Sequence, residues 1–65
     1  MEDNNRKTFR ELRLERGITN KHVSKLLGIK PVSLCHKEAG RRQFNLQEVE
    51  KLLDLYGVSI SDVKY

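Results

Sequence analysis

The sequence contains little or nothing of what several classes of protein require. Cys35 is the one cysteine, which excludes a disulfide within the chain and a cysteine-rich zinc site, and fits a reducing, cytoplasmic setting. Tryptophan is absent, proline occurs once and glycine four times, so long coil segments are not expected. No apolar run approaches the ~18 residues of a membrane span. The first residues, MEDNNRK, lack the apolar segment of a secretory signal, so we expect no contact with a membrane.

Patterns of catalytic and metal-binding residues are also missing. His22 and His36 have no Cys, His or Asp partners at the spacing of a metal site, and there is no glycine-rich phosphate loop. Cys35 and His36 are neighbours, and adjacent helical residues point about 100° apart, so they do not form a nucleophile–base pair. We interpret Cys35 as a small filler residue. The expectation is no enzymatic activity, no metal, no cofactor and no small-molecule ligand.

The charge of the chain is unevenly distributed. The net charge is +4, but residues 1–43 carry eleven Lys and Arg against five acidic residues, whereas residues 44–65 carry two against four. A basic surface attracts polyanions such as nucleic acid. Lys and Arg also serve simply to solvate a surface, so the charge by itself leaves both interpretations open.

Two local signals mark the expected helix boundaries. Glycine favours the left-handed position that ends a helix, and the glycines are Gly17, Gly28, Gly40 and Gly57. Apolar residues five positions apart form a hydrophobic staple across a helix start, and these pairs are Ile18 and Val23, Ile29 and Leu34, Phe44 and Val49, and Val58 and Val63. Thr19 and Asn45 stand at N-cap positions, and Pro31 stands at a first helical position, where its missing N–H costs nothing.

These signals predict an all-α fold, a single compact domain over residues 1–65 in which residues 1–5 form a frayed leader. The five expected helices cover about residues 6–16, 20–27, 31–38, 46–56 and 60–64. Helical periodicity predicts a core of Phe9, Leu12, Ile18, Val23, Leu26, Leu27, Ile29, Leu34, Val49, Leu52, Leu53 and Ile60.

The stretch from Thr19 to Glu38, TNKHVSKLLGIKPVSLCHKE, reads as two short helices joined by a turn at Gly28. Together with its flanks, over about residues 9–60, it resembles the Xre/Cro-type helix-turn-helix family of phage repressors and bacterial regulators. Ser24 takes the family's small-residue place, and the inward apolar places are taken by Val23, Leu27, Ile29 and Leu34. The resemblance implies a compact repressor-like domain whose helix near 31–38 reads the major groove of double-stranded DNA.

The resemblance also implies roles for single residues. Arg13 and Glu38 match a pair that forms a partly buried salt bridge in relatives, and Val32 is placed for contact with a thymine methyl group. The implied base contacts are Lys30, Pro31, Val32, Ser33 and His36. The implied phosphate contacts are Asn20, Lys21, Lys25, Lys37, Arg41 and Arg42.

Lys37 departs from the family, which has an apolar, inward-facing residue at that place. Two explanations are open. Either the stem of Lys37 lies along the edge of the core with its ammonium group in water, or the recognition helix is loosely seated.

The expected function is that of a small, repressor-like transcriptional regulator of phage or mobile-element type. One short module reads few base pairs, so we expect a homodimer on a two-fold operator. Contact between protomers and closure of the core are equally open for Tyr56, Val58, Val63 and Tyr65. The alternative function is a protein-interaction module, antirepressor-like or antitoxin-like, that has this fold but does not bind DNA. Lys37 and Pro31 favour the alternative, and the basic first part of the chain opposes it.

Overall fold

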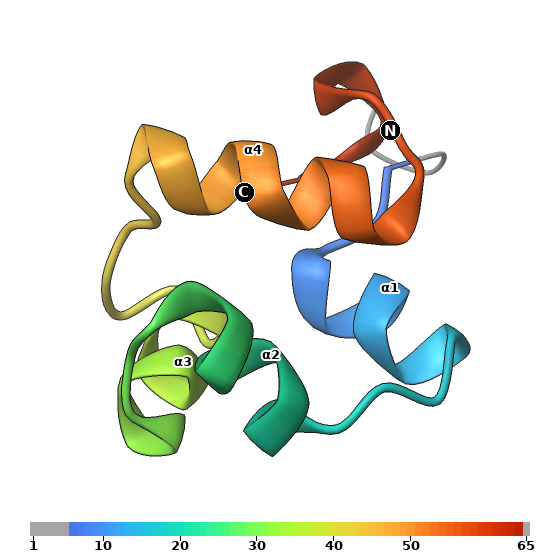
Figure 1. The fold of residues 1–65 in the computed structure, drawn as a ribbon. Helices are drawn as coiled ribbons and strands as arrows, with labels where there is room; N and C mark the ends of the chain where they lie inside the picture. The colour runs from blue at the N-terminus through green and yellow to red at the C-terminus, as the bar shows by residue number, and fades with distance from the viewer. Residues whose placement is uncertain (1–5, 65) are drawn as a thin grey trace.

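Four α-helices and a short terminal turn make up the fold. The computed structural model describes residues 6–64, and the elements in this range are α1 (Phe9–Glu15), α2 (Asn20–Leu27), α3 (Pro31–Glu38), α4 (Leu46–Tyr56) and the 3-10 turn η1 (Ile60–Asp62). In Figure 1, α4 lies across the molecule, with α2 and α3 below one of its ends and α1 below the other. The all-helical prediction is confirmed. The fifth α-helix predicted over 60–64 is not formed.

The first helix begins at Phe9 rather than near residue 6, because Thr8 caps it. Thr8 Oγ1 accepts a hydrogen bond from the Glu11 N–H at 3.1 Å, and the Thr8 N–H donates to Glu11 Oε1 at 2.9 Å. The bond from the Thr8 N–H also holds the pKa of Glu11 below its ordinary value. The predicted caps of α2 and α4 are confirmed: Thr19 and Asn45 each accept a bond from the third residue of the helix.

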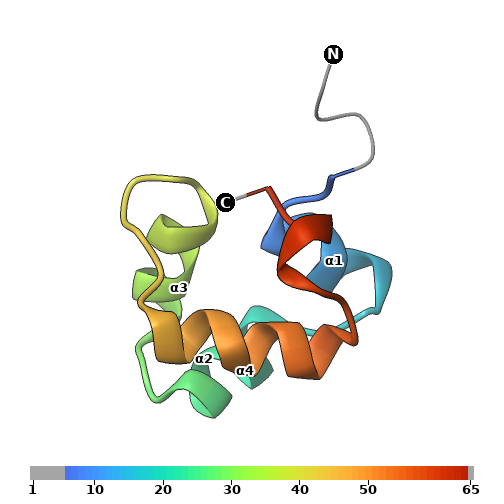
Figure 2. The ribbon, with the colours of Figure 1, turned by 90° about the horizontal axis from the view of Figure 1, so that it is seen from above.

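The two ends of the described chain pair with each other as extended segments. The Lys7 N–H donates to the Asp62 carbonyl at 3.2 Å, and the Lys64 N–H donates to the Lys7 carbonyl at 2.8 Å. These bonds form a parallel bridge between Lys7 and Val63, and Figure 2 shows the blue and red segments side by side. The extended conformation at Val63 ends η1 after three residues and turns the Val63 side chain into the core.

The core lies where α1, α2, α3 and α4 meet. Two predicted members are wrong: Leu26 is 43% exposed and Ile60 is 44% exposed. Leu26 lies beside the buried stripe of α2, and Val63 takes the inward place near Ile60 because the chain is extended there. The buried apolar side chains are Phe9, Leu12, Val23, Leu27, Leu34, Val49, Leu52, Tyr56 and Val63.

Two of the four residues considered for a contact between protomers close the core instead. Tyr56 is 3% exposed and Val63 is 1% exposed within the single chain. A partner could reach their side chains only if the core opened. Val58 is half-buried against the core, and Tyr65 lies outside the described residues.

Replacing Tyr56 with phenylalanine is expected to raise the free energy of unfolding, by up to about 1 kcal/mol. The Tyr56 hydroxyl is buried and has no hydrogen-bond partner in the described part of the chain, and its burial raises the pKa of Tyr56 to about 12. Phenylalanine keeps the ring beside Phe9, where the ring centroids are 6.3 Å apart. Urea unfolding of the two proteins tests this prediction, and a clear loss of stability in the variant would contradict it.

Candidate nucleic-acid interface

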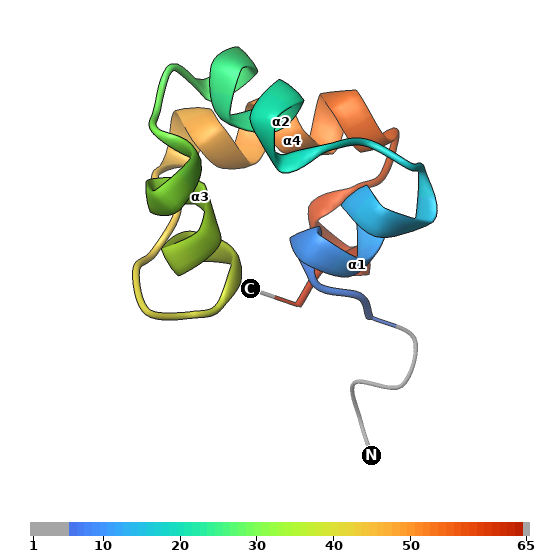
Figure 3. The ribbon, with the colours of Figure 1, turned by 90° about the horizontal axis from the view of Figure 1, so that it is seen from below.

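The helices α2 and α3 form a compact helix-turn-helix unit. Gly28 ends α2 with φ 73°, in the left-handed region that favours glycine, and the Ile29 N–H donates back to the Ser24 carbonyl at 3.0 Å. Ser24 is buried, and its small side chain lets the two helices approach closely. Val23 from α2 and Leu34 from α3 are both fully buried, so the angle between the helices is set by core packing. Figure 3 shows the two helices side by side and at an angle.

The outward face of α3 is apolar in its first turn. Pro31 and Val32 are exposed there, and 57% of Val32 is accessible. Lys30 precedes them as the N-cap residue and makes no side-chain capping bond. Ser33 and His36 are half-buried. The five residues implied as base contacts therefore differ in accessibility, with Lys30, Pro31 and Val32 the most accessible.

Asn20 connects the two helices of the unit. Its Nδ2 donates to the Pro31 carbonyl at 3.3 Å, and its Oδ1 is buried without a hydrogen-bond partner in the described part of the chain. In this structure the side chain is therefore directed to α3, and its phosphate contact stays a prediction. The remaining cations expected at phosphates, Lys21, Lys25, Arg41 and Arg42, are all exposed, and none forms an ion pair within residues 6–64.

A bidentate ion pair ties α3 to α1. Arg13 Nε donates to Glu38 Oε2 at 2.9 Å and a terminal nitrogen donates to Glu38 Oε1 at 3.1 Å, while the other terminal nitrogen donates to the Ile18 carbonyl at 3.0 Å. The two side chains are 10% and 4% exposed. The hydrogen bonds that Arg13 donates to Glu38 raise the pKa of Arg13 above its ordinary value. The end of α3 is thereby fixed to α1 and to the loop that follows α1.

Lys37 is not available as a phosphate contact in this structure. Its Nζ lies 2.6 Å from Glu48 Oε1, with the two side chains 14% and 8% exposed, and 6.0 Å from the centre of the Phe44 ring. Neither explanation considered from the sequence applies, because the ammonium group is paired rather than in water and α3 is tied to α4 rather than loose. The sequence signal was the charged residue Lys37 at a place expected to be apolar, and nothing in the sequence pattern identified Glu48 as its partner.

The free energy of unfolding is expected to depend on pH through the Glu48 carboxyl group. Burial by itself would raise the pKa of Glu48, but the hydrogen bonds from Lys37 and the Asn45 N–H outweigh it, so the pKa is below the ordinary value of 4.5. A depressed folded-state pKa stabilises the fold above the unfolded-state pKa, and this contribution is lost as pH falls through the folded-state value.

The free energy of unfolding is therefore expected to fall as pH decreases below about 4.5, and to fall less steeply in the Glu48→Gln variant. Urea titrations at a series of pH values measure this slope. Glu50→Gln, which alters an exposed carboxylate of the same helix, serves as the matched control. Identical slopes for the wild type and Glu48→Gln would contradict the prediction.

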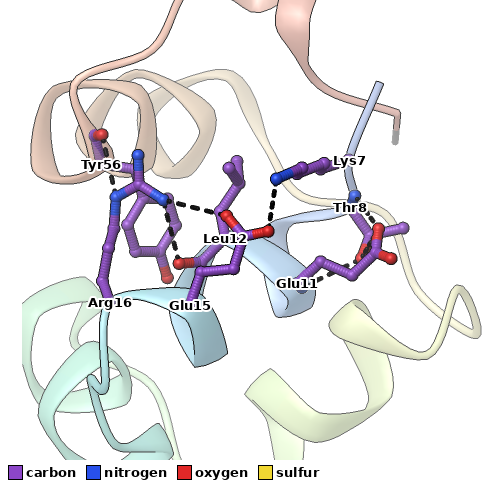
Figure 4. A network of polar contacts seen from close by, with 7 residues as sticks. All are labelled: Lys7, Thr8, Glu11, Leu12, Glu15, Arg16 and Tyr56. Carbon is purple, nitrogen blue, oxygen red and sulfur yellow. Dashed lines mark hydrogen bonds and ion pairs between the residues drawn. The ribbon is translucent and has the colours of Figure 1, made fainter. Parts of the chain in front are cut away.

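Two further cations, Arg16 and Lys7, contact other residues of the same chain (Figure 4). Arg16 Nε donates to the Tyr56 carbonyl at 3.1 Å, and a terminal nitrogen donates to the Leu12 carbonyl at 3.2 Å, so Arg16 joins the ends of α1 and α4. Lys7 forms an ion pair with Glu15. The excess of positive charge in the first part of the chain is thus partly structural, and the exposed cations of α2 and of the loop after α3 remain for an anionic partner.

Two other kinds of site are absent from the described part of the chain. No group of three His, Cys, Asp or Glu side chains in residues 6–64 could hold a metal ion. In the same range no helix has the length and apolar character to cross a membrane.

Comparison with known protein families gives one match. A family model described as a helix-turn-helix domain matches residues 7–64. No curated protein and no solved structure matches the chain. The matched range spans every helix of the fold, the Arg13–Glu38 pair and the terminal bridge.

Proposed function

The chain belongs to the helix-turn-helix domain family, a family of DNA-binding regulatory domains rather than of enzymes, and on this premise we propose that it is a sequence-specific transcriptional regulator. In the proposal it is a small repressor-like protein of the Xre/Cro type that acts in the cytoplasm on phage or mobile-element DNA. The helix α3 enters the major groove, and α2 crosses the phosphate backbone.

The observation that carries the proposal is the division of charged residues between scaffold and surface. The cations Arg13, Arg16 and Lys37 are engaged with carboxylates or backbone carbonyls. Lys21 and Arg42, on the two sides of α3 along the chain, are exposed and unpaired within residues 6–64. Exposed cations on the segments before and after a groove-binding helix are suited to contact the phosphates that border the groove.

The first turn of α3 is suited to reading thymine. Val32 presents an exposed apolar side chain and Pro31 has no N–H to donate, so this turn offers apolar contact to a C5-methyl group. Lys30, Ser33 and His36 supply hydrogen-bonding groups on either side. The proposed operator therefore contains thymine at the position that faces Val32.

Selection of bound duplexes from a random pool, with titrations at two salt concentrations, tests the proposed function. Affinity that falls with salt and a defined preferred sequence are expected. Weak, salt-independent binding without a preferred sequence would contradict DNA binding and favour the protein-interaction module. Of the two residues that favoured that alternative, Lys37 no longer does so, because Glu48 neutralises it.

Replacing Val32 with alanine is expected to relax the preference for thymine at one operator position, with a cost of ~1–3 kcal/mol in discrimination there. The valine methyl groups make the proposed contact, and alanine is too short to reach as far. Repeating the selection with the variant measures the change. Leu46→Ala, which removes an exposed apolar side chain from α4, is the matched control and should leave the selected sequence unchanged.

We further propose a homodimer on a two-fold operator, since one α3 contacts few base pairs. With Tyr56 and Val63 in the core, Val58 and the exposed Ile60 supply the apolar surface near the end of the chain. The selected sequences should then contain inverted half-sites about 10 base pairs apart, centre to centre. A single, unrepeated half-site would contradict the dimer.

A further inference from the structure

The loop between α3 and α4, residues 39–45, carries Arg41 and Arg42. Part of this loop does not pack against the core. A hollow of about 630 Å³ lies between the loop and the two terminal segments, with Arg42 and Gln43 on one wall and Thr8 and Lys64 on another. Figure 2 shows the loop standing apart from α1 at the edge of the molecule. The positions of the two guanidinium groups therefore depend on how the ends of the loop are held.

Three contacts hold those ends. The Arg41 N–H donates to the His36 carbonyl at 2.9 Å, which continues the last turn of α3. The Phe44 ring packs edge-on against Phe9, with 5.1 Å between centroids. Across the base of the loop, Lys37 Nζ lies 2.6 Å from Glu48 Oε1, which joins the last turn of α3 directly to the first turn of α4.

The Glu48 oxygen that binds Lys37 also fixes the last residue of the loop. Glu48 Oε1 accepts a hydrogen bond from the Asn45 N–H at 3.0 Å, and Asn45 Oδ1 accepts one from the Glu48 N–H at 2.8 Å. Both charged side chains are largely buried, so solvent screens their attraction little. One carboxylate thus sets both the start of α4 and its distance from α3.

We propose that the Lys37–Glu48 ion pair is a positioning device for DNA binding. It holds Arg42 at the distance from α3 at which Arg42 reaches a phosphate while α3 lies in the major groove. Lys37 and Glu48 themselves do not touch DNA and act through the loop. Arg41 depends less on the pair, because its backbone is already bonded to α3. The inference rests on the proposed DNA-binding function.

A double-mutant cycle tests the positioning role. The four proteins are the wild type, Arg42→Ala, the double variant Lys37→Met/Glu48→Gln, and the combination of all three changes. The double variant removes one positive and one negative charge, so the net charge is unchanged. Glutamine at position 48 still completes the capping box, and methionine fills the space of the lysine stem, so the fold is retained. Circular dichroism verifies this.

Dissociation constants are measured by fluorescence anisotropy on the duplex selected with the wild type. Arg42→Ala is expected to weaken binding by at least threefold in the wild-type background. In the double variant the same change is expected to shift the logarithm of the dissociation constant by less than half as much. Residues that act through one another are not additive in such a cycle. Equal factors in the two backgrounds would overturn the proposal.

Two controls separate this role from a general loss of structure. Lys21→Ala removes an exposed cation of α2, outside the loop, and should cost the same factor in both backgrounds. Arg41→Ala should show a smaller coupling than Arg42→Ala. If the double variant does not fold, Glu48→Gln alone takes its place in the cycle. Equal factors for Arg42→Ala in the two backgrounds would again overturn the proposal. A wild type without salt-dependent duplex binding overturns the proposed function and this inference together, whereas additive factors in a binding-competent wild type overturn this inference alone.

Discussion

Replacement of both Arg41 and Arg42 by alanine is expected to weaken binding to every duplex. If the wild type and the variant bind equally at 1 M salt, the variant binds about 30-fold more weakly at 0.15 M salt. Each phosphate contact contributes a slope of about −0.9 to log affinity against log salt, so two lost contacts flatten the slope by about 1.8. Both side chains are exposed and lie in the loop that follows α3. Titrations on the selected duplex and on an unrelated duplex measure the change.

The loss should be nearly the same on the two duplexes, because phosphate contacts carry no direct sequence information. Lys51→Ala, which removes an exposed cation of α4, is the matched control and should leave the slope unchanged. An unchanged slope in the double arginine variant would remove both arginines from the interface. A loss confined to the selected duplex would instead assign them to base contacts.

Replacement of Glu38 by alanine is expected to lower the free energy of unfolding by ~3–5 kcal/mol, since it leaves the Arg13 guanidinium buried without its carboxylate. At ~0.05–0.15 kcal/mol per residue, 65 residues have a total stability of ~3–10 kcal/mol, so a third or more of the stability is lost. Arg13 is 8% exposed, and both of its bonds to Glu38 are shorter than 3.2 Å. Thermal and urea unfolding measure the effect.

The Lys7–Glu15 pair offers the matched comparison. It joins a cation and a carboxylate that are 50% and 45% exposed, so Glu15→Ala should cost less than ~1 kcal/mol. A cost for Glu38→Ala as small as that for Glu15→Ala would show that Arg13 finds water or another partner when Glu38 is removed. Neither change alters a residue that is proposed to contact DNA.

The helix α3 is held by ion pairs as well as by apolar packing. Leu34 is its one buried side chain among the described residues, and the last two residues of α3, Lys37 and Glu38, are both in largely buried ion pairs with other helices. Replacing both members of such a pair by apolar residues often costs little, whereas removing one member leaves a buried charge unpaired. Of the two explanations left open for Lys37, loose seating of α3 does not apply, because Lys37 makes a specific contact with Glu48.

Much of the fold was predictable because its signals are local. Thr19, Asn45 and Gly28 act within one turn of their own helices, and the ends of α2, α3 and α4 agree with the prediction. The same kind of signal was present in Thr8 and Glu11, where the capping box starts α1 later than the predicted boundary near residue 6. The failure over 60–64 has another cause, because the bonds that draw Val63 into an extended segment come from Lys7 at the other end of the chain.

The sequence by itself determined the helices, the turn at Gly28 and the residues that α3 presents, because caps, glycines and periodicity act over a few positions. Only the tertiary structure decided which cations remain for DNA. Lys37 and Glu48 are 11 positions apart along the chain, and Arg16 and the Tyr56 carbonyl are 40 positions apart. The Arg13–Glu38 pair, 25 positions apart, was expected, but from the family resemblance rather than from a local pattern. No local pattern fixes such partners. Such partners are brought together by the packing of helices that lie far apart along the chain.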